Sequence, residues 1–372
     1  MKKILLLAYT NFNFGDDMFI YTICKAFPNQ EFVLYANQTY RKTFGKVSNL
    51  TIAEIGTIQR FYNKLINKFP NLYKVNITTL GYAAVVYVIG GLFDEDESWK
   101  SNVNQYGMKK LKNIMWRNSY GVKTPFFLLG CNMTRVMSTE YIGQMEYLFR
   151  GLKDICFRDK YSYSFFEQLS NTRYAPDIVF NYDCKQTAKE DSVVISVWGP
   201  LTCVDRFPQW KWAEELWDPY EKFIIEIIGE FQKMGKKVTL LALCKNEGDL
   251  EACNKIRNRG KLDVDIVNYN GNLDETVKMF ETASFVVGTR FHSVVMALNA
   301  GCAFYPIVYE SKTEQLLIDI GYDAGYSHIE KQQTYNVENV MRNYRKKISF
   351  SCENIKKMAL EQFRELKNYL EV

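Results

Sequence analysis

Short apolar runs alternate with amphipathic stretches along the whole chain, and this alternation predicts parallel β-sheets covered by α-helices. Runs rich in β-branched and aromatic residues indicate buried strands, and apolar positions spaced three or four apart indicate helices. The predicted strands are 3–8, 31–35, 83–89, 125–129, 154–157, 192–197, 237–243, 263–267, 284–288 and 303–309. The predicted helices are 16–27, 139–151, 160–169, 219–234, 247–259, 274–282, 293–299 and 313–320. The expected fold class is therefore α/β.

A polar stretch at 185–191 interrupts the alternation near the middle of the chain. Because 372 residues exceed one core of ordinary size, we expect two domains of roughly 150 to 190 residues each. The first is expected over 1–184 and the second over 190–345, followed by a C-terminal helix over 346–372. Two Rossmann-like domains facing a central cleft would place ligands at the carboxyl ends of both sheets.

The composition indicates a globular protein of the cytoplasm. Hydrophobic residues make up 47% of the chain and charged residues 24%. No uncharged apolar stretch approaches the roughly 18 residues that a membrane span needs. The nine cysteines are an odd number without a C-x-x-C pair, which favours reduced thiols over disulfides or a zinc site. A net charge of +5 without a nucleic-acid-binding motif argues against nucleic acid as a partner.

An arginine and a histidine follow the predicted strand 284–288 and begin the next helix, in the string Gly288-Thr289-Arg290-Phe291-His292-Ser293. The positive end of that helix and the guanidinium group together predict an anion site. The alternative is an ion-paired arginine beside a packed histidine. Placement at the carboxyl end of a parallel strand favours function.

Two further cations take equivalent places at predicted sheet edges. Lys312 follows the strand 303–309, and Arg158 follows the strand 154–157. Each could instead form an exposed salt bridge of little energetic value. Three cations after three strands nevertheless favour an anionic ligand.

Short motifs along residues 1–320 resemble those of the polysaccharide pyruvyl transferases, in the same order. They are Asn13-x-Gly15-Asp16, Gly90-Gly91, Arg158-Asp159-x-x-Ser162, Pro176-Asp177, the string from Gly288 to Ser293, and Tyr309-x-x-Lys312. One departure is Leu92, where the family often has a third glycine.

The resemblance implies a GT-B-like fold, phosphoenolpyruvate as the donor, and catalysis centred on Arg290 and His292. His292 is the expected general acid and base, because an imidazole exchanges protons near neutral pH. Arg290 and Arg158 are the expected clamps on the donor's phosphate and carboxylate. The expected donor site also includes the motif residues Phe291 and Ser293, with Lys312 as a further cation. Phosphoenolpyruvate is a co-substrate, and no other cofactor is implied.

Four polar residues are candidates for the acceptor sugar. Asp16, Asp17 and Asn13 lie where the first strand meets the first helix, and Asp177 lies near the end of the first domain. Asp16 would orient or deprotonate a sugar hydroxyl; the alternative is that it is the N-cap of the helix. Asp17, Asn13 and Asp177 would contact the acceptor.

Tryptophans crowd the segment after the strand 192–197. Trp198 and Trp210 could stack on a sugar ring, although aromatic residues of this kind also pack as a hydrophobic cover. Acidic triplets at 94–96 and 263–265 resemble a D-x-D metal motif. We interpret the first as a solvated loop and the second as a strand, and we predict no required metal.

Basic residues recur every four positions at Arg60, Lys64 and Lys68, beside apolar ones. This pattern predicts a basic amphipathic helix, which either covers a core or rests on anionic lipid. The second placement would suit a lipid-linked oligosaccharide acceptor and peripheral contact with the cytoplasmic face of the inner membrane.

Two other functions fit the same fold. A GT-B glycosyltransferase would bind a nucleotide sugar in the second domain, with an acidic residue such as Glu310 on the ribose. A non-catalytic sugar-binding protein would have His292 buried against a structural partner. The Arg290-Phe291-His292 string favours the pyruvyl transferase over both.

Overall fold

A computed structural model describes residues 2–54, 81–88, 90–91, 93, 95, 124–133, 138–185, 187–199 and 213–371. The chain forms two compact units. The N-terminal unit comprises Met1–Thr10, Phe19–Ile178 and Met358–Val372, and the C-terminal unit comprises Asn11–Met18 and Val179–Lys357. The change of unit at 178/179 comes before the expected boundary at 184–190, and the expected C-terminal segment 346–372 divides at 357/358.

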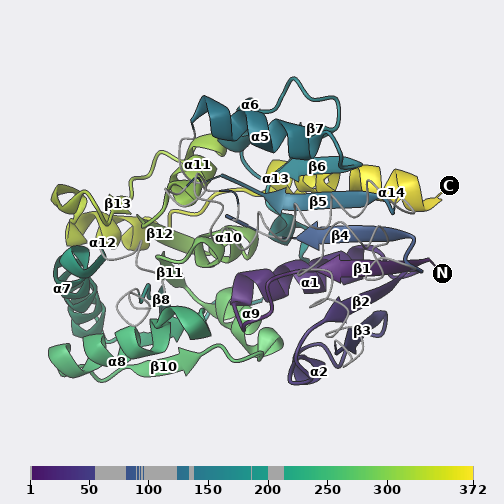
Figure 1. The fold of residues 1–372 in the computed structure, drawn as a ribbon. Helices are drawn as coiled ribbons and strands as arrows, with labels where there is room; N and C mark the ends of the chain where they lie inside the picture. The colour runs from purple at the N-terminus through teal and green to yellow at the C-terminus, as the bar shows by residue number, and fades with distance from the viewer. Residues whose placement is uncertain are drawn as a thin grey trace. The chain divides into compact units, whose positions relative to one another are not determined.

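The N-terminal unit is built on a seven-stranded parallel sheet in the order β3-β2-β1-β4-β5-β6-β7 (Figure 1). Its strands are β1 (Lys3–Leu7), β2 (Glu31–Tyr35), β3 (Leu50–Ala53), β4 (Ala84–Val88), β5 (Phe126–Cys131), β6 (Asp154–Phe157) and β7 (Thr172–Tyr174). Every residue of β4, β5 and β6 is buried, as the continuous apolar runs of a covered parallel sheet require. The helices include α1 (Phe14–Ala26), α2 (Tyr40–Thr43), α5 (Thr139–Phe149) and α6 (Lys160–Ser164).

The C-terminal unit has a six-stranded parallel sheet in the order β10-β9-β8-β11-β12-β13. Its strands are β8 (Ser192–Ser196), β9 (Lys237–Ala242), β10 (Asp265–Asn268), β11 (Phe285–Gly288), β12 (Ala303–Val308) and β13 (Ser327–His328). Helices α7 (Ala213–Lys233), α8 (Asp249–Gly260) and α12 (Val337–Arg345) pack together over one core, and α9 (Leu273–Thr282), α10 (Phe291–Asn299) and α11 (Ser311–Asp319) adjoin one another (Figure 1).

These two sheets confirm the predicted α/β class with two Rossmann-like domains. All ten predicted strands are present. The strands that the pattern missed are β3, with one buried residue among its four, and β7 and β13, with only three and two residues. In both sheets the strand order reverses beside the first strand, between β1 and β4 and between β8 and β11. Such switch points are where ligands bind in open α/β sheets.

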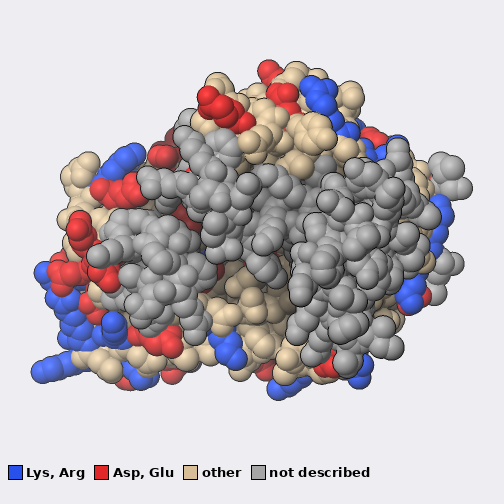
Figure 2. All heavy atoms as spheres, in the orientation of Figure 1, with Lys and Arg blue, Asp and Glu red and all other residues tan. Residues whose placement is uncertain are grey.

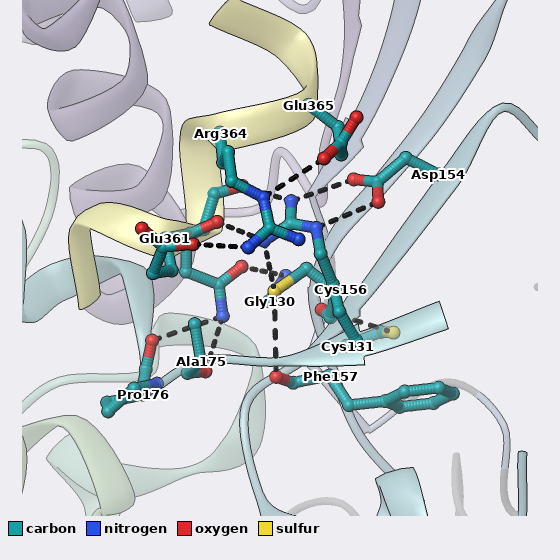
Figure 3. A network of polar contacts seen from close by, with 12 residues as sticks. Gly130, Cys131, Asp154, Cys156, Phe157, Ala175, Pro176, Glu361, Arg364 and Glu365 are labelled. Carbon is teal, nitrogen blue, oxygen red and sulfur yellow. Dashed lines mark hydrogen bonds and ion pairs between the residues drawn. The ribbon is translucent and has the colours of Figure 1, made fainter. Parts of the chain in front are cut away.

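The C-terminal end of the chain is tied to the N-terminal unit by a buried polar network (Figure 3). The Arg173 side chain of β7 donates to both carboxylate oxygens of Asp154 at 2.8 Å and to the Gln362 carbonyl at 2.8 Å. The Gln362 amide accepts from Gly130 N–H and donates to the carbonyls of Ala175 and Pro176. A register shift in β5 at Gly130, with φ +68°, turns that N–H out of the ladder. The helices α13 (Glu353–Ala359) and α14 (Arg364–Glu371) flank the network.

Within the described ranges, no helix is long and apolar enough to cross a membrane, and no group of three His, Cys, Asp or Glu side chains could hold a metal ion. The described surface in Figure 2 carries basic and acidic side chains interspersed. The predicted basic helix around Arg60, the residues Asp94 and Asp96, and Trp210 lie outside the described residues.

Candidate functional site

The segment after β11 folds as a strand, a cap and a helix. Arg290 occupies the N-cap position of α10 with extended backbone (φ −68°, ψ 136°). The Ser293 backbone and hydroxyl both donate to the Arg290 carbonyl, at 2.9 and 2.5 Å. Thr289, completely buried, is bonded to the Tyr220 hydroxyl at 2.9 Å. The motif therefore lies at the β8/β11 switch point. Its backbone passes from a strand through a turn into a helix, as the sequence predicts.

The Arg290 guanidinium is held by two carboxylates. Its Nε lies 3.0 and 3.1 Å from the oxygens of Asp249, and its Nη2 also donates to Asp249. Its Nη1 donates to Glu247. The Arg290 side chain is only 6% exposed. Arg290 is therefore a fixed, desolvated cation with anionic partners from its own chain.

Asp249 is anchored by the backbone. As the first residue of α8, it accepts hydrogen bonds from the N–H groups of Gly199, Leu243 and Cys244 at 3.1, 3.2 and 2.9 Å. Gly199 has to be glycine, because a Cβ there would lie 2.2 Å from the carbonyl oxygen of Gly248. Asp249 and Glu247 were not among the residues predicted from sequence; the available signal was a pair of carboxylates after the strand 237–243.

Burial and Arg290 act in opposite directions on the two carboxylates. Burial raises the pKa of Asp249 to about 6, even though Arg290 and the N–H donor of Cys244 lower it. Burial also raises the pKa of Glu247, but Arg290 and Lys312 outweigh burial and hold that pKa below its ordinary value. At neutral pH both groups are carboxylates, so Arg290 faces two negative charges.

Tyr309, which follows β12, connects Arg290 with the second predicted cation. The Arg290 guanidinium lies 5.5 Å and the Lys312 ammonium 5.3 Å from the centre of the Tyr309 ring. Lys312 is ion-paired with Glu310. The Trp198 ring lies 5.5 Å from the Tyr309 ring and is 1% exposed. Arg290 and Lys312 thus share one site, whereas Trp198 lies in the core beneath it, where a packing aromatic residue is expected.

His292 belongs to the same unit and is partly exposed in the first turn of α10. Its imidazole lies against the backbone of Gly15, where an added Cβ would come 1.7 Å from Nδ1. The Gly15 N–H donates to the Asn13 side chain at 3.0 Å, and Phe14 N–H donates to the Leu243 carbonyl at 3.1 Å. Residues 11–18 thereby bring the start of α1 to the histidine.

Three residues predicted to act on the acceptor sugar lie at the start of α1. Asn13 precedes the first helical residue and caps the helix, so the alternative that Asp16 is the N-cap is wrong. Asp16 lies inside the first turn and is partly exposed. Asp17 is completely buried and accepts a hydrogen bond from the hydroxyl of Tyr269.

The N-terminal unit contains a second buried cation at Arg158, directly after β6. Its Nη1 donates to Asp177 at 3.0 Å and its Nη2 to the Asn132 side-chain oxygen at 2.7 Å. A Cβ on Gly90 would lie 3.0 Å from Nη2, so the glycine turn after β4 borders the guanidinium. Asn132 is completely buried, and its Nδ2 has no hydrogen-bond partner among the residues that the structure describes. Asn132 was not among the residues predicted from sequence.

Solved structures with the same fold include a UDP-GlcNAc 2-epimerase and two proteins in complex with UDP. The UDP-GlcNAc 2-epimerase of Methanocaldococcus jannaschii aligns with a TM-score of 0.59 at 11% identity, covering 99% of this chain and 100% of its own. Staphylococcus aureus MnaA with UDP aligns at 0.57 and 12%, covering 100% and 97%. Anabaena HepE in complex with UDP aligns at 0.53 and 12%, covering 98% and 100%. These likenesses establish the GT-B fold and nothing beyond it.

The family is established by sequence. The model of the polysaccharide pyruvyl transferase family matches residues 13–311, a span from Asn13 before α1 to Ser311 after Tyr309. The chain therefore belongs to the polysaccharide pyruvyl transferases, a family of transferases, as its motifs indicate. A search among curated proteins found no match.

Proposed function

We propose that the protein transfers pyruvate from phosphoenolpyruvate to two hydroxyls of one sugar, forming a pyruvate ketal on a polysaccharide or its precursor. One observation carries this proposal: within one helical turn, a partly exposed imidazole follows a cation whose position is fixed by Asp249. Arg290 supplies charge for an anionic donor, and His292 supplies a group that exchanges protons. Family membership supports the same chemistry.

The reaction needs few groups from the protein. A proton is added to the methylene carbon of the donor, and one sugar hydroxyl attacks the adjacent carbon with loss of its own proton. The second hydroxyl then forms the other C–O bond while the C–O bond to phosphate breaks, releasing inorganic phosphate. In this proposal His292 delivers the first proton and accepts one from the first hydroxyl, and the proton of the second hydroxyl leaves with inorganic phosphate. Arg290 and the N-terminus of α10 stabilise the developing negative charge.

Of the remaining predicted residues, some act directly on a substrate in this proposal and others act through a neighbouring side chain. Asp16 is the candidate base for the acceptor, because it is partly exposed. Arg158 is a second anion-binding candidate, with Asn132 as its positioning partner. Asp17 and Asp177 act through the buried residues that they bond, Tyr269 and Arg158. No metal and no cofactor beyond phosphoenolpyruvate is part of the proposal.

We place the reaction in the cytoplasm, where phosphoenolpyruvate is available. The sequence pattern around Arg60, Lys64 and Lys68 supports peripheral contact with an anionic membrane face, and such contact would give access to a lipid-linked acceptor.

Titration calorimetry with phosphoenolpyruvate and, in parallel, UDP tests the donor. The wild type should bind phosphoenolpyruvate, Arg290→Ala should lose that binding, and His292→Ala should retain it but release no phosphate when an acceptor is added. Binding of UDP without phosphoenolpyruvate would instead support the nucleotide-sugar glycosyltransferase. Binding of sugars alone, with no turnover of either donor, would support the non-catalytic alternative.

A further inference from the structure

The two carboxylates on Arg290 are held in very different ways. Asp249 is completely buried and accepts three backbone N–H groups in addition to the guanidinium. Glu247 ends a three-residue 3₁₀ turn, and its side chain is 21% exposed. The next residue, Gly248, has φ +77°, a left-handed conformation that favours glycine. Asp249 is part of the scaffold, whereas Glu247 can turn toward solvent.

The described side chains that are ion-paired at Arg290 and Lys312 carry a net negative charge. Arg290 and Lys312 contribute two positive charges, and Asp249, Glu247 and Glu310 contribute three negative ones, so the sum is 2 − 3 = −1. An incoming phosphate or carboxylate would meet like charges in a site of low dielectric constant, where repulsion is strong. An anion therefore binds Arg290 more favourably once one carboxylate moves aside.

Glu247 is the carboxylate placed to move. Among the described carboxylates, it alone joins partial exposure to a direct bond with Arg290, since Asp249 is anchored and Glu310 pairs with Lys312. Its carboxylate is also the same chemical group as the carboxylate of phosphoenolpyruvate. We infer that Glu247 is an internal competitor of the donor, occupying on Arg290 the position that the donor's anionic group takes, and that it thereby sets the affinity for the donor.

If Glu247 competes with the donor, removing its charge should strengthen anion binding. Glu247→Gln keeps the size of the side chain but replaces a charge-assisted hydrogen bond with a weaker neutral one. Removing the competitor should therefore tighten anion binding, lowering the Kd for phosphoenolpyruvate and for inorganic phosphate by about fivefold to tenfold. Asp249→Asn should have the opposite effect, because Arg290 loses its anchor. A purely structural role for Glu247 would weaken binding in both variants.

The experiment is calorimetry on the full chain with phosphoenolpyruvate, inorganic phosphate and UDP. The matched control is Glu338→Gln, which removes an equal charge from an exposed pair with Arg345 in the same unit and should leave every Kd unchanged. Glu310→Gln is the second comparison. It removes an equal charge from the pair with Lys312 and should give a smaller gain, because Glu310 does not bond Arg290. The inference is overturned if Glu247→Gln binds no tighter than wild type, if Glu310→Gln or Glu338→Gln gives the same gain, or if neither wild type nor Glu247→Gln binds any of the three anions.

The inference rests on the proposed function only for the identity of the donor. If the wild type binds UDP or inorganic phosphate but not phosphoenolpyruvate, the proposed function fails. The ratio of Kd values between wild type and Glu247→Gln for the anion that does bind then still decides whether Glu247 competes for Arg290.

Discussion

The backbone of Gly15 lies directly against the imidazole of His292, leaving no room for a side chain: a Cβ would come 1.7 Å from Nδ1. We predict that Gly15→Ala displaces the imidazole and lowers kcat for phosphate release by about 10- to 100-fold, since a 1 Å misplacement of a reacting group has effects of that order. Binding of phosphoenolpyruvate should persist, because Arg290 is untouched.

The matched control for Gly15→Ala is Gly229→Ala. Gly229 lies in α7 of the same unit with open space where a Cβ would be. Alanine there should stabilise the helix by about 1 kcal/mol and leave kcat unchanged. Steady-state kinetics on both variants checks the prediction, and equal activity in the two would remove His292 from catalysis.

Tyr269 stabilises the fold through Asp17, to which its hydroxyl donates a hydrogen bond in a fully buried place. Tyr269→Phe deprives a buried carboxylate of a donor, and it should lower the free energy of unfolding by about 1–3 kcal/mol. Urea denaturation followed by tryptophan fluorescence measures the change. Tyr147→Phe, at a residue 79% exposed, should change stability by less than about 0.5 kcal/mol.

Arg173 should be among the most sensitive residues of the N-terminal unit. Arg173→Leu leaves Asp154 buried and unpaired and frees the Gln362 carbonyl, which should destabilise by about 3–5 kcal/mol. The control is Arg364→Ala, which removes two exposed ion pairs with Glu361 and Glu365 and should cost less than about 1 kcal/mol. Similar losses in both variants, measured by thermal or urea unfolding, would mean that the buried network contributes little.

The described thiols should react only when the protein unfolds. All eight described cysteines are free and buried, and burial raises the pKa of Cys156 and Cys184 to about 12 and that of Cys352 to about 11. In a Cys203→Ser variant, Ellman's reagent at pH 8 should therefore label native protein slowly and all eight thiols in guanidinium. Rapid labelling of the native variant would contradict this.

The raised pKa values of these thiols predict that the protein loses stability in alkali. Above the ordinary thiol pKa of 9.0, the unfolded chain loses protons that the native chain retains, so the native state binds more protons and stability falls as the pH rises. The stability that these groups contribute is complete below pH 9 and is lost progressively as the pH approaches their raised values.

The alternation of apolar and amphipathic stretches was sufficient to predict the fold, because parallel strands that are buried on both faces appear in the sequence as continuous apolar runs. The run 83–89 became β4, and the run 125–129 became β5, both without an exposed residue. The location of Arg290 and His292 followed from the same pattern, since a residue after a parallel strand lies at the carboxyl edge of the sheet.

The partners of the cations could not be predicted in the same way. Asp249 meets Arg290 because β8 lies between β9 and β11, and strand order leaves no trace in local periodicity. Asn132 meets Arg158 because β5 is adjacent to β6. Glu247 and Asp249 looked like ordinary polar residues at a helix start, and only the sheet order makes them ligands of a guanidinium.

The chain passes between its two units at residues 10/11, 18/19, 178/179 and 357/358, and this route limits how the protein can be divided. A gene fragment cut at the polar stretch 185–191 would carry Asn11–Met18 away from Leu243 and His292, and the other fragment would retain the residues from Met358 onward that bind Gly130 and Arg173. The cut would also separate Phe14 from the rings of Tyr269 and Phe280, and Phe27 and Phe127 from those of Phe363 and Tyr369. Exchanging the N-terminal unit for that of a relative would require three segments to be replaced together, and exchanging the C-terminal unit would require two.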